Sequence, residues 1–470
     1  MRNFAAIVAG PITGGVLSIE KFQHVSSENY SAEEAELEMS EAQDAAEEVQ
    51  AIQADLSQAQ EVAGSLEDIE GLITEGEPLT EREANLVAVA GDLAYAGTEP
   101  GDVEPIVPEA AMESYRTGGR ISFENRFTDA IKNFWRYIKQ IVAKAWKKMK
   151  EFYAKYFGPV KKLEKTFEAL KKEASALAGS AKIRDNERNF DLTSGVSTLC
   201  IDYKALTSGA EVLKHGQQFT QLLRSALSAD AANKARAFLE GVNGIVSGFE
   251  PDSANAAATV AQVASVFQSL VKGRLAWGFT KTTLANSGDY EFYTSPTVFG
   301  NRSVFIRVHR NAMAANATAQ TAADLAALNK TSISFRETIE NTSKEKPTEC
   351  SFSILTPTQM EDLCDQAIEW TRILQAHSGG RAFADLEKER TRLEKSTDSL
   401  EARFVKYEGR SNASSTGATG VSVALYRQFV SLNSVALNVA AGTTLPLEKH
   451  ALGVMGAYRH IIKASMSHYE

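Results

Sequence analysis

The sequence of 470 residues predicts a mainly α-helical fold with a small antiparallel β-sheet, an α+β protein preceded by an acidic leader. Apolar residues recur at helical spacing through most of the chain, which predicts helices. Short runs of aromatic and β-branched residues are confined to 273–310 and 351–355, which predicts a few short strands. Hydrophobic residues make up 43% of the chain and charged residues 23%, so most of it can bury a core.

The first predicted unit, 1–113, is strongly acidic. It contains 25 Asp and Glu and only three Lys and Arg, whereas 114–470 contains 35 acidic and 47 basic residues. The net charge of −10 therefore combines about −22 before residue 114 with about +12 after it. Residues 32–60 are rich in Ala, Glu and Gln but poor in large apolar side chains, which predicts a partly disordered or marginally helical leader. A Pro-rich linker follows at 98–108.

The second predicted unit, 114–189, is a basic aromatic amphipathic helical segment. On an ideal helix, the aromatic and aliphatic residues of 122–157 fall within about 160°, except Tyr137, and basic residues fill the other side, with Lys139 at the boundary. Gly158 and Pro159 end this helix, and a second helix is expected over 161–177. The residues expected to contact DNA or an anionic surface are Lys132, Arg136, Lys144, Lys147, Lys148, Lys150, Lys155, Lys161 and Lys162.

The third predicted unit, 190–470, is a mixed helical body with the small sheet and C-terminal helices. A heptad pattern over 383–407 predicts a long helix of a bundle or a short coiled coil, with Arg390 and Thr397 at two of its apolar positions. The other expected helices are 212–239, 256–271, 357–375, 421–441 and 447–465. The expected strands are Leu275–Phe279, Tyr290–Tyr293, Ser303–His309 and Ser351–Leu355.

The chain contains none of the motifs that would indicate an enzyme, a cofactor or a metal site. Phosphate-binding loops, dinucleotide fingerprints, zinc-protease motifs and serine-hydrolase elbows are all missing from the sequence. The three cysteines are widely spaced, which argues against a disulfide framework or a zinc site and favours a reducing compartment. The sequence contains no run of 18 uncharged apolar residues, so it predicts no membrane-spanning helix. We therefore expect a non-enzymatic protein without a cofactor.

Two features remain for function, and each has more than one interpretation. The 122–157 helix can pack on the protein's own core, lie on a membrane surface, or contact nucleic acid without sequence preference. The acidic leader can cover the basic stretch until it is removed, or it can be a permanent solubilising tail.

The order of these segments resembles the internal head proteins of giant tailed bacteriophages, also described as inner-body or prohead core proteins. The resemblance lies in an acidic Ala- and Glu-rich leader, a small-x-Glu site, and a Phe-, Trp- and Lys-rich helix that opens the mature domain. It implies that the leader is a propeptide, cut by a head-maturation protease after Ser/Ala/Gly-x-Glu. Ala111, Met112 and Glu113 match this pattern where the charge reverses. The pattern is not unique to this position, and further matches include those that end at Glu20, Glu67, Glu124 and Glu211.

The resemblance implies a virion structural protein of the capsid interior, present in the host cytoplasm during assembly. Its expected partners are the maturation protease, packaged genomic DNA bound without sequence preference, the capsid or other inner-head proteins, and further copies of the same chain. Two alternatives stay open at this point. One is a membrane-surface protein acting through 122–157, and the other is a plain oligomeric scaffold protein.

Overall fold

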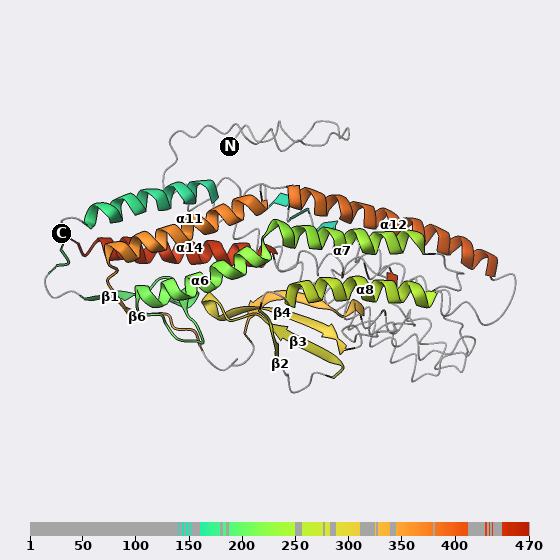
Figure 1. The fold of residues 1–470 in the computed structure, drawn as a ribbon, viewed down its shortest axis with the longest axis horizontal. Helices are drawn as coiled ribbons and strands as arrows, with labels where there is room; N and C mark the ends of the chain where they lie inside the picture. The colour runs from blue at the N-terminus through green and yellow to red at the C-terminus, as the bar shows by residue number, and fades with distance from the viewer. Residues whose placement is uncertain are drawn as a thin grey trace, which may run out of the picture.

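The protein is described by a computed structural model in which helices lie side by side along the long axis and a small sheet lies against them (Figure 1). The residues described are 160–178, 188–249, 256–275, 278–282, 288–310, 328–338, 345–378, 381–411 and 444–469, with shorter stretches between 140 and 151, at 182–184, and at 325, 428, 429, 432 and 435.

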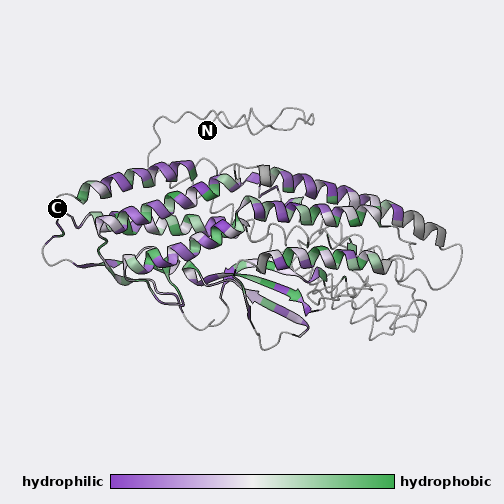
Figure 2. Ribbon diagram, viewed as in Figure 1, coloured by the Kyte–Doolittle hydropathy of each residue, from purple (hydrophilic) through white to green (hydrophobic). Residues whose placement is uncertain are grey.

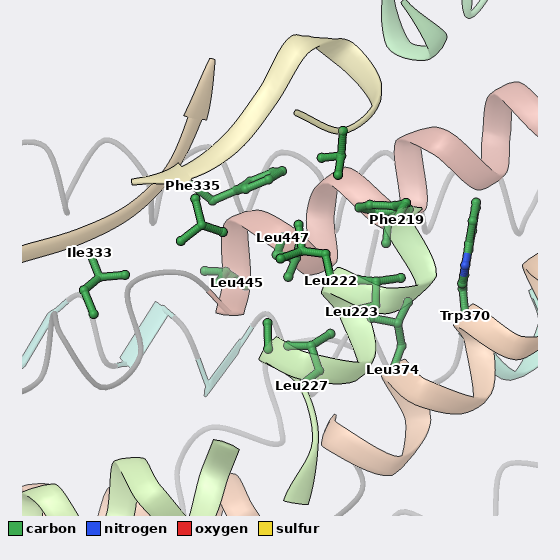
Figure 3. Packing of buried hydrophobic residues seen from close by; sticks show 14 of the residues in the cluster. Phe219, Leu222, Leu223, Leu227, Ile333, Phe335, Trp370, Leu374, Leu445 and Leu447 are labelled. Carbon is green, nitrogen blue, oxygen red and sulfur yellow. The ribbon is translucent and has the colours of Figure 1, made fainter. Parts of the chain in front are cut away.

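One half of the molecule is a helical bundle. Helices α6 (Gly209–Ala226), α11 (Pro357–Ser378) and α14 (Thr444–Met466) pack together, and helical residues 160–177, hereafter the 160–177 helix, lie beside α11 (Figure 1). Each helix turns an apolar stripe inward, as Figure 2 shows by alternating bands of hydropathy. Side chains from α6, α11 and α14 and from the sheet meet in one core (Figure 3); they include Phe219, Leu223, Phe335, Trp370, Leu374 and Leu447.

The other half contains α7 (Ala229–Gly248), α8 (Ala256–Leu275) and α12 (Arg381–Ser411), and α7 packs against both α8 and α12 (Figure 1). The Phe238 and Phe267 rings join α7 to α8 edge to face, 5.0 Å between centroids. On α12, buried leucines recur every seventh residue at Leu386, Leu393 and Leu400. The heptad of the sequence therefore packs α12 on α7 within the chain.

The four-stranded sheet is antiparallel in the order β2 (Thr280–Thr282), β3 (Tyr290–Thr294), β4 (Arg302–His309) and β5 (Ser332–Glu337). Alternate residues of β4 and β5 on one face are buried in the common core, which covers that face. These residues are Val304, Ile306, Val308, Ile333 and Phe335. A separate two-stranded sheet pairs β1 (Asn189–Leu192) with β6 (Cys350–Ser353).

A tight turn joins the sheet to the helical bundle. The short helix η2 (Phe299–Asn301) precedes β4, and α5 (Val196–Leu199) lies against it. The Gly300 N–H donates to the Cys200 carbonyl oxygen at 2.9 Å, and His450 Nε2 on α14 donates to the Phe299 carbonyl oxygen at 2.7 Å. Gly300 has φ +68°, and a Cβ there would lie 3.0 Å from His450 Cε1, so this turn requires glycine.

The predicted fold class is confirmed, because the described chain is mainly helical with small antiparallel sheets. The strands expected at 290–293, 303–309 and 351–355 are present as β3, β4 and β6. The helices expected at 256–271, 357–375, 383–407 and 447–465 correspond to α8, α11, α12 and α14.

Three expectations of secondary structure need correction. The helix expected over 212–239 is two helices, because Ser228 begins α7 by accepting a hydrogen bond from the Ala231 N–H at 3.1 Å. The strand expected at 275–279 is wrong, since α8 continues to Leu275 and β2 begins only at Thr280. Strands β1 and β5 were not predicted; both gain their hydrogen bonds from partners distant in sequence.

The whole leader, 1–113, and most of the first basic helix lie outside the described residues. The same holds for most of the helix expected at 421–441. The boundaries at 113 and 189 therefore stay predictions.

Candidate nucleic-acid interface

The predicted site residues divide into those that the structure describes and those that it does not. The cleavage residues Ala111, Met112 and Glu113, and the basic residues Lys132, Arg136 and Lys155, lie outside the described residues. Lys144, Lys147, Lys148 and Lys150 lie on helical residues; all are exposed except Lys148, which is half-buried. Of the remaining two, Lys161 is exposed and Lys162 is half-buried, both on the 160–177 helix.

Two of these lysines contact carboxylates of the chain itself. Lys150 forms an ion pair with Glu387 near the start of α12, and Lys148 Nζ lies 3.9 Å from Glu151 Oε2. Such pairs at a surface contribute only about 0–1 kcal/mol each, so they orient the segment more than they stabilise it. Lys150 therefore places part of the basic segment beside α12.

The 160–177 helix is held to the bundle by one apolar face. This confirms the amphipathic helix expected over 161–177, with Leu163, Phe167 and Leu170 on a shared face. The buried residues of this face are Val160, Leu163, Phe167, Leu170 and Ala174. Burying a side chain as large as Phe167 contributes about 1.5–3 kcal/mol, so apolar burial is the main force that holds the helix in place.

Polar contacts on both flanks fix the register of this helix against α11. The Glu164 carboxylate accepts hydrogen bonds from Arg372 Nε at 2.8 Å and from Gln375 Nε2 at 2.9 Å. Burial opposes the ionisation of Glu164, but these bonds outweigh it and hold the pKa of the carboxyl below its ordinary value. Lys171 Nζ donates to both oxygens of Asp365 at 2.6 Å, which raises the pKa of the lysine.

The outward side of the 160–177 helix carries exposed lysines. Lys161, Lys165 and Lys172 are exposed, and on an ideal helix they fall within about 40° of one another, opposite the buried face. Glu168 lies on the same side, so this lysine stripe keeps an excess of two positive charges. Lys171 is not part of it, because its ammonium group pairs with Asp365. A stripe of this kind suits phosphate groups and carries no means of reading a base sequence.

The described residues hold no arrangement that suggests catalysis. None of their His, Cys, Asp and Glu side chains form a group of three or more that could bind a metal ion. Cys200 and Cys364 are buried and form no disulfide, and burial raises the pKa of the Cys364 thiol to about 12, which keeps it protonated and unreactive. Among the helices described, none is long and apolar enough to cross a membrane.

A family model built on phiKZ-like phage internal head proteins matches residues 32–454. The chain belongs to the phiKZ-like phage internal head proteins. It is therefore a structural protein of the phage head, located in the capsid interior. No curated protein and no solved structure matches the chain.

The family match covers both sides of the predicted boundary at residue 113. It begins within the acidic leader and ends within α14, so the leader from residue 32, the basic segment and most of the body belong to one family pattern. The acidic and basic parts are thus recognised together, on both sides of the charge reversal near residue 113.

Sequence reasoning missed a second group of basic residues, Arg307 on β4 and Arg336 on β5. The signal was present in the alternation of Ser332-Ile-Ser-Phe-Arg-Glu337, where every second residue can face one side of a sheet. Because β5 was not predicted, its register with β4 could not be inferred, and the two arginines could not be placed on the same face.

Proposed function

We propose that this internal head protein is made as a precursor, enters the prohead core, and is cut after Glu113 by the head-maturation protease. The mature chain, 114–470, then stays with the packaged DNA and contacts it without sequence preference. The observation that carries the proposal is the coincidence of the Ala111-Met112-Glu113 motif with the point where about −22 gives way to about +12.

The positions of competing cleavage motifs support the choice of Glu113. Within the described residues, three tripeptides fit Ser/Ala/Gly-x-Glu, and they end at Glu211, Glu369 and Glu401. They lie in α6, α11 and α12, respectively. Proteases cut most readily where the backbone can leave its folded structure, so a helix must open before such a site is cut.

The motif at Glu211 is further protected by its own side chain. The Glu211 carboxylate accepts hydrogen bonds from the Thr207 N–H at 3.0 Å and from the Ser208 hydroxyl at 3.2 Å. These bonds lower the pKa of the carboxyl and fasten the first turn of α6. We therefore expect Glu211 to be spared in the folded chain, although its tripeptide fits the pattern as well as that of Glu113.

The proposed cleavage separates the acidic leader from the part of the chain that forms the described core. The helices and the sheet at and after Val160 bury one continuous apolar cluster. The lysine stripe is also downstream of the cleavage site, so cleavage removes acidic residues while keeping the cationic ones. Each lysine that contacts a phosphate releases a counterion, which makes such binding steeply dependent on salt.

Peptide mass spectrometry of particles before and after maturation tests the processing step. We expect a peptide beginning at Ser114 in mature particles and leader peptides only in proheads. A Glu113→Gln variant should keep the leader, and Glu211→Gln is the matched control that should be processed normally. Uniform coverage of 1–113 in mature particles would refute cleavage.

A plain scaffold role is the second candidate, and the Lys150–Glu387 ion pair favours it. It would mean that the basic segment serves packing within the head and not contact with DNA. Hydrogen exchange separates the two roles. Strong protection of 140–151 together with no DNA affinity at low salt would support the scaffold.

A further inference from the structure

The outer face of the four-stranded sheet has an unusual composition. Residues paired across an antiparallel sheet share a face. The register of β3, β4 and β5 therefore places six residues together on the side opposite the buried core: Tyr290, Phe292, Phe305, Arg307, His309 and Arg336. Every other position on this face of β2–β5 is Ser or Thr. In Figure 1, the sheet lies at the edge of the helical layers, beside α8.

This face is cationic and carries no carboxylate. Arg307 and Arg336 are its permanent charges, and within the described part of the chain neither forms an ion pair with Asp or Glu. Arg336 is exposed and Arg307 is half-buried. Burial and the nearby charge of Arg307 lower the pKa of Arg336, which indicates that the two guanidinium groups repel each other. A bound anion would relieve this repulsion.

The arginines are held in place against aromatic rings. The Arg336 guanidinium carbon lies 4.6 Å from the Phe305 ring centroid, and that of Arg307 lies 5.4 Å from the Tyr290 centroid. Arg307 Nε also donates to the Lys330 carbonyl oxygen at 3.1 Å. A guanidinium has five N–H donors, so this single bond leaves donors for a phosphate while it fixes the orientation of the group.

We propose that this outer face binds single-stranded nucleic acid. Phosphates contact the Arg307 and Arg336 guanidinium groups, and unpaired bases stack on the half-buried Tyr290 and Phe292 rings and on the planar guanidinium groups. Aromatic and arginine planes on a cationic surface are the general means by which proteins hold unpaired bases without reading their order.

A duplex is the less suitable ligand for this face. Its bases are stacked on one another and expose only their edges, so the rings of the sheet would gain nothing from them. The lysine stripe of the 160–177 helix, in contrast, offers charge without rings and suits the phosphates of a duplex. The inference therefore goes beyond the proposed function, with a different ligand and a different surface.

Two probes and two surfaces test the inference in the full chain. The probes are an oligothymidine of about 20 nucleotides and a duplex of the same length, each titrated over a salt series. The variant Arg307→Gln/Arg336→Gln should weaken oligothymidine binding at least about tenfold, and should reduce its salt slope by about 1.4, since each lost single-strand contact removes about 0.7. Duplex binding should stay within about twofold.

Matched variants keep the test decisive. Arg307→Lys/Arg336→Lys retains both charges and should keep the salt slope, which separates loss of binding from loss of folding. Lys165→Gln/Lys172→Gln should weaken duplex binding and spare oligothymidine, so a failure of the proposed function is visible separately. The inference is overturned if the chain does not bind oligothymidine, or if neutralising both arginines leaves that binding unchanged.

Discussion

At the scale of single residues, a buried hydrogen bond joins α11 to α6. Trp370 Nε1 donates to Thr220 Oγ1 at 2.7 Å, and that hydroxyl donates to the Gly216 carbonyl oxygen at 2.8 Å. Thr220→Val preserves the shape of the side chain but leaves the indole N–H without its acceptor. We expect a loss of about 1–3 kcal/mol in the free energy of unfolding, measured in urea. Thr220→Ser keeps the hydroxyl and should be more stable than Thr220→Val; the reverse order would contradict this assignment.

A second prediction at this scale concerns His450. Burial lowers its pKa from 6.5 to about 3, and the positive charges of Arg302 and Lys346 act in the same direction. The folded chain therefore keeps the ring neutral while the unfolded chain protonates it below pH 6.5. The contribution of His450 to the free energy of unfolding is complete above pH 6.5. It decreases by about 1.4 kcal/mol per pH unit as the pH falls from 6.5 towards 3.

Two variants test the pH dependence. His450→Gln can still donate to the Phe299 carbonyl oxygen but cannot be protonated in this pH range, so its unfolding free energy should fall less steeply between pH 6.5 and 5. His460→Gln, on an exposed position of the same helix, is the matched control and should keep the slope of the original chain. Equal slopes in all three proteins would show that His450 does not control acid sensitivity.

The burial of a residue could be predicted where it follows from local spacing. The contacts of a residue could not be predicted where they depend on pairing between distant parts of the chain. Leu163, Phe167 and Leu170 were assigned to one face from helical periodicity alone, and they are buried. The contact of His450 with Phe299 joins residues that are 151 positions apart, so no local pattern predicts it. The pairing of β4 with β5 is equally non-local, which is why Arg336 was missed.

At the scale of helices and strands, the contact of α6 with α11 and α14 depends on a glycine. A Cβ at Gly216 would overlap the Gln366 amide and the Tyr458 hydroxyl, which bond each other at 3.1 Å. Gly216→Ala should therefore cost about 1–3 kcal/mol in unfolding free energy, measured in urea. Gly244→Ala on α7 meets nothing within 4 Å and should instead stabilise by about 0.5–1 kcal/mol. Equal effects of both changes would contradict the close packing at Gly216.

The element boundaries show where propensity and packing disagree. A continuous helical pattern runs through Leu227 and Ser228, yet α6 ends before them. The Ser228 hydroxyl caps the start of α7, and α7 then packs on α8 and α12. Leu275 was assigned to a strand because aromatic residues follow it, but packing extends α8 to that residue. Type and approximate position were predictable for long helices, while their ends were decided by tertiary contacts.

At the scale of the whole molecule, we predict that the core does not need the leader. The described helices and sheet bury one continuous apolar cluster, so removal of 1–113 should change the melting temperature by no more than about 2 °C, which corresponds to about 1–2 kcal/mol for a chain of this size. Calorimetry of 1–470 and 114–470 measures this difference. Loss of cooperative unfolding in 114–470 would show that the leader is part of the fold.

The proposed cleavage would also change the charge of the molecule. The chain 1–470 carries −10, whereas 114–470 carries about +12, so under the proposed cleavage the body would present opposite fields to DNA before and after maturation. The charge reversal was predictable from the sequence, because it depends only on residue counts on either side of one site.

The most direct test is the affinity of 1–470 and of 114–470 for the same random-sequence duplex, measured side by side from low to physiological salt. The account predicts weak binding by the precursor and clear binding by the processed chain, with a slope of log affinity against log salt of about −0.9 for each phosphate contacted. Equal affinity of the two chains, or no salt dependence for 114–470, would contradict it.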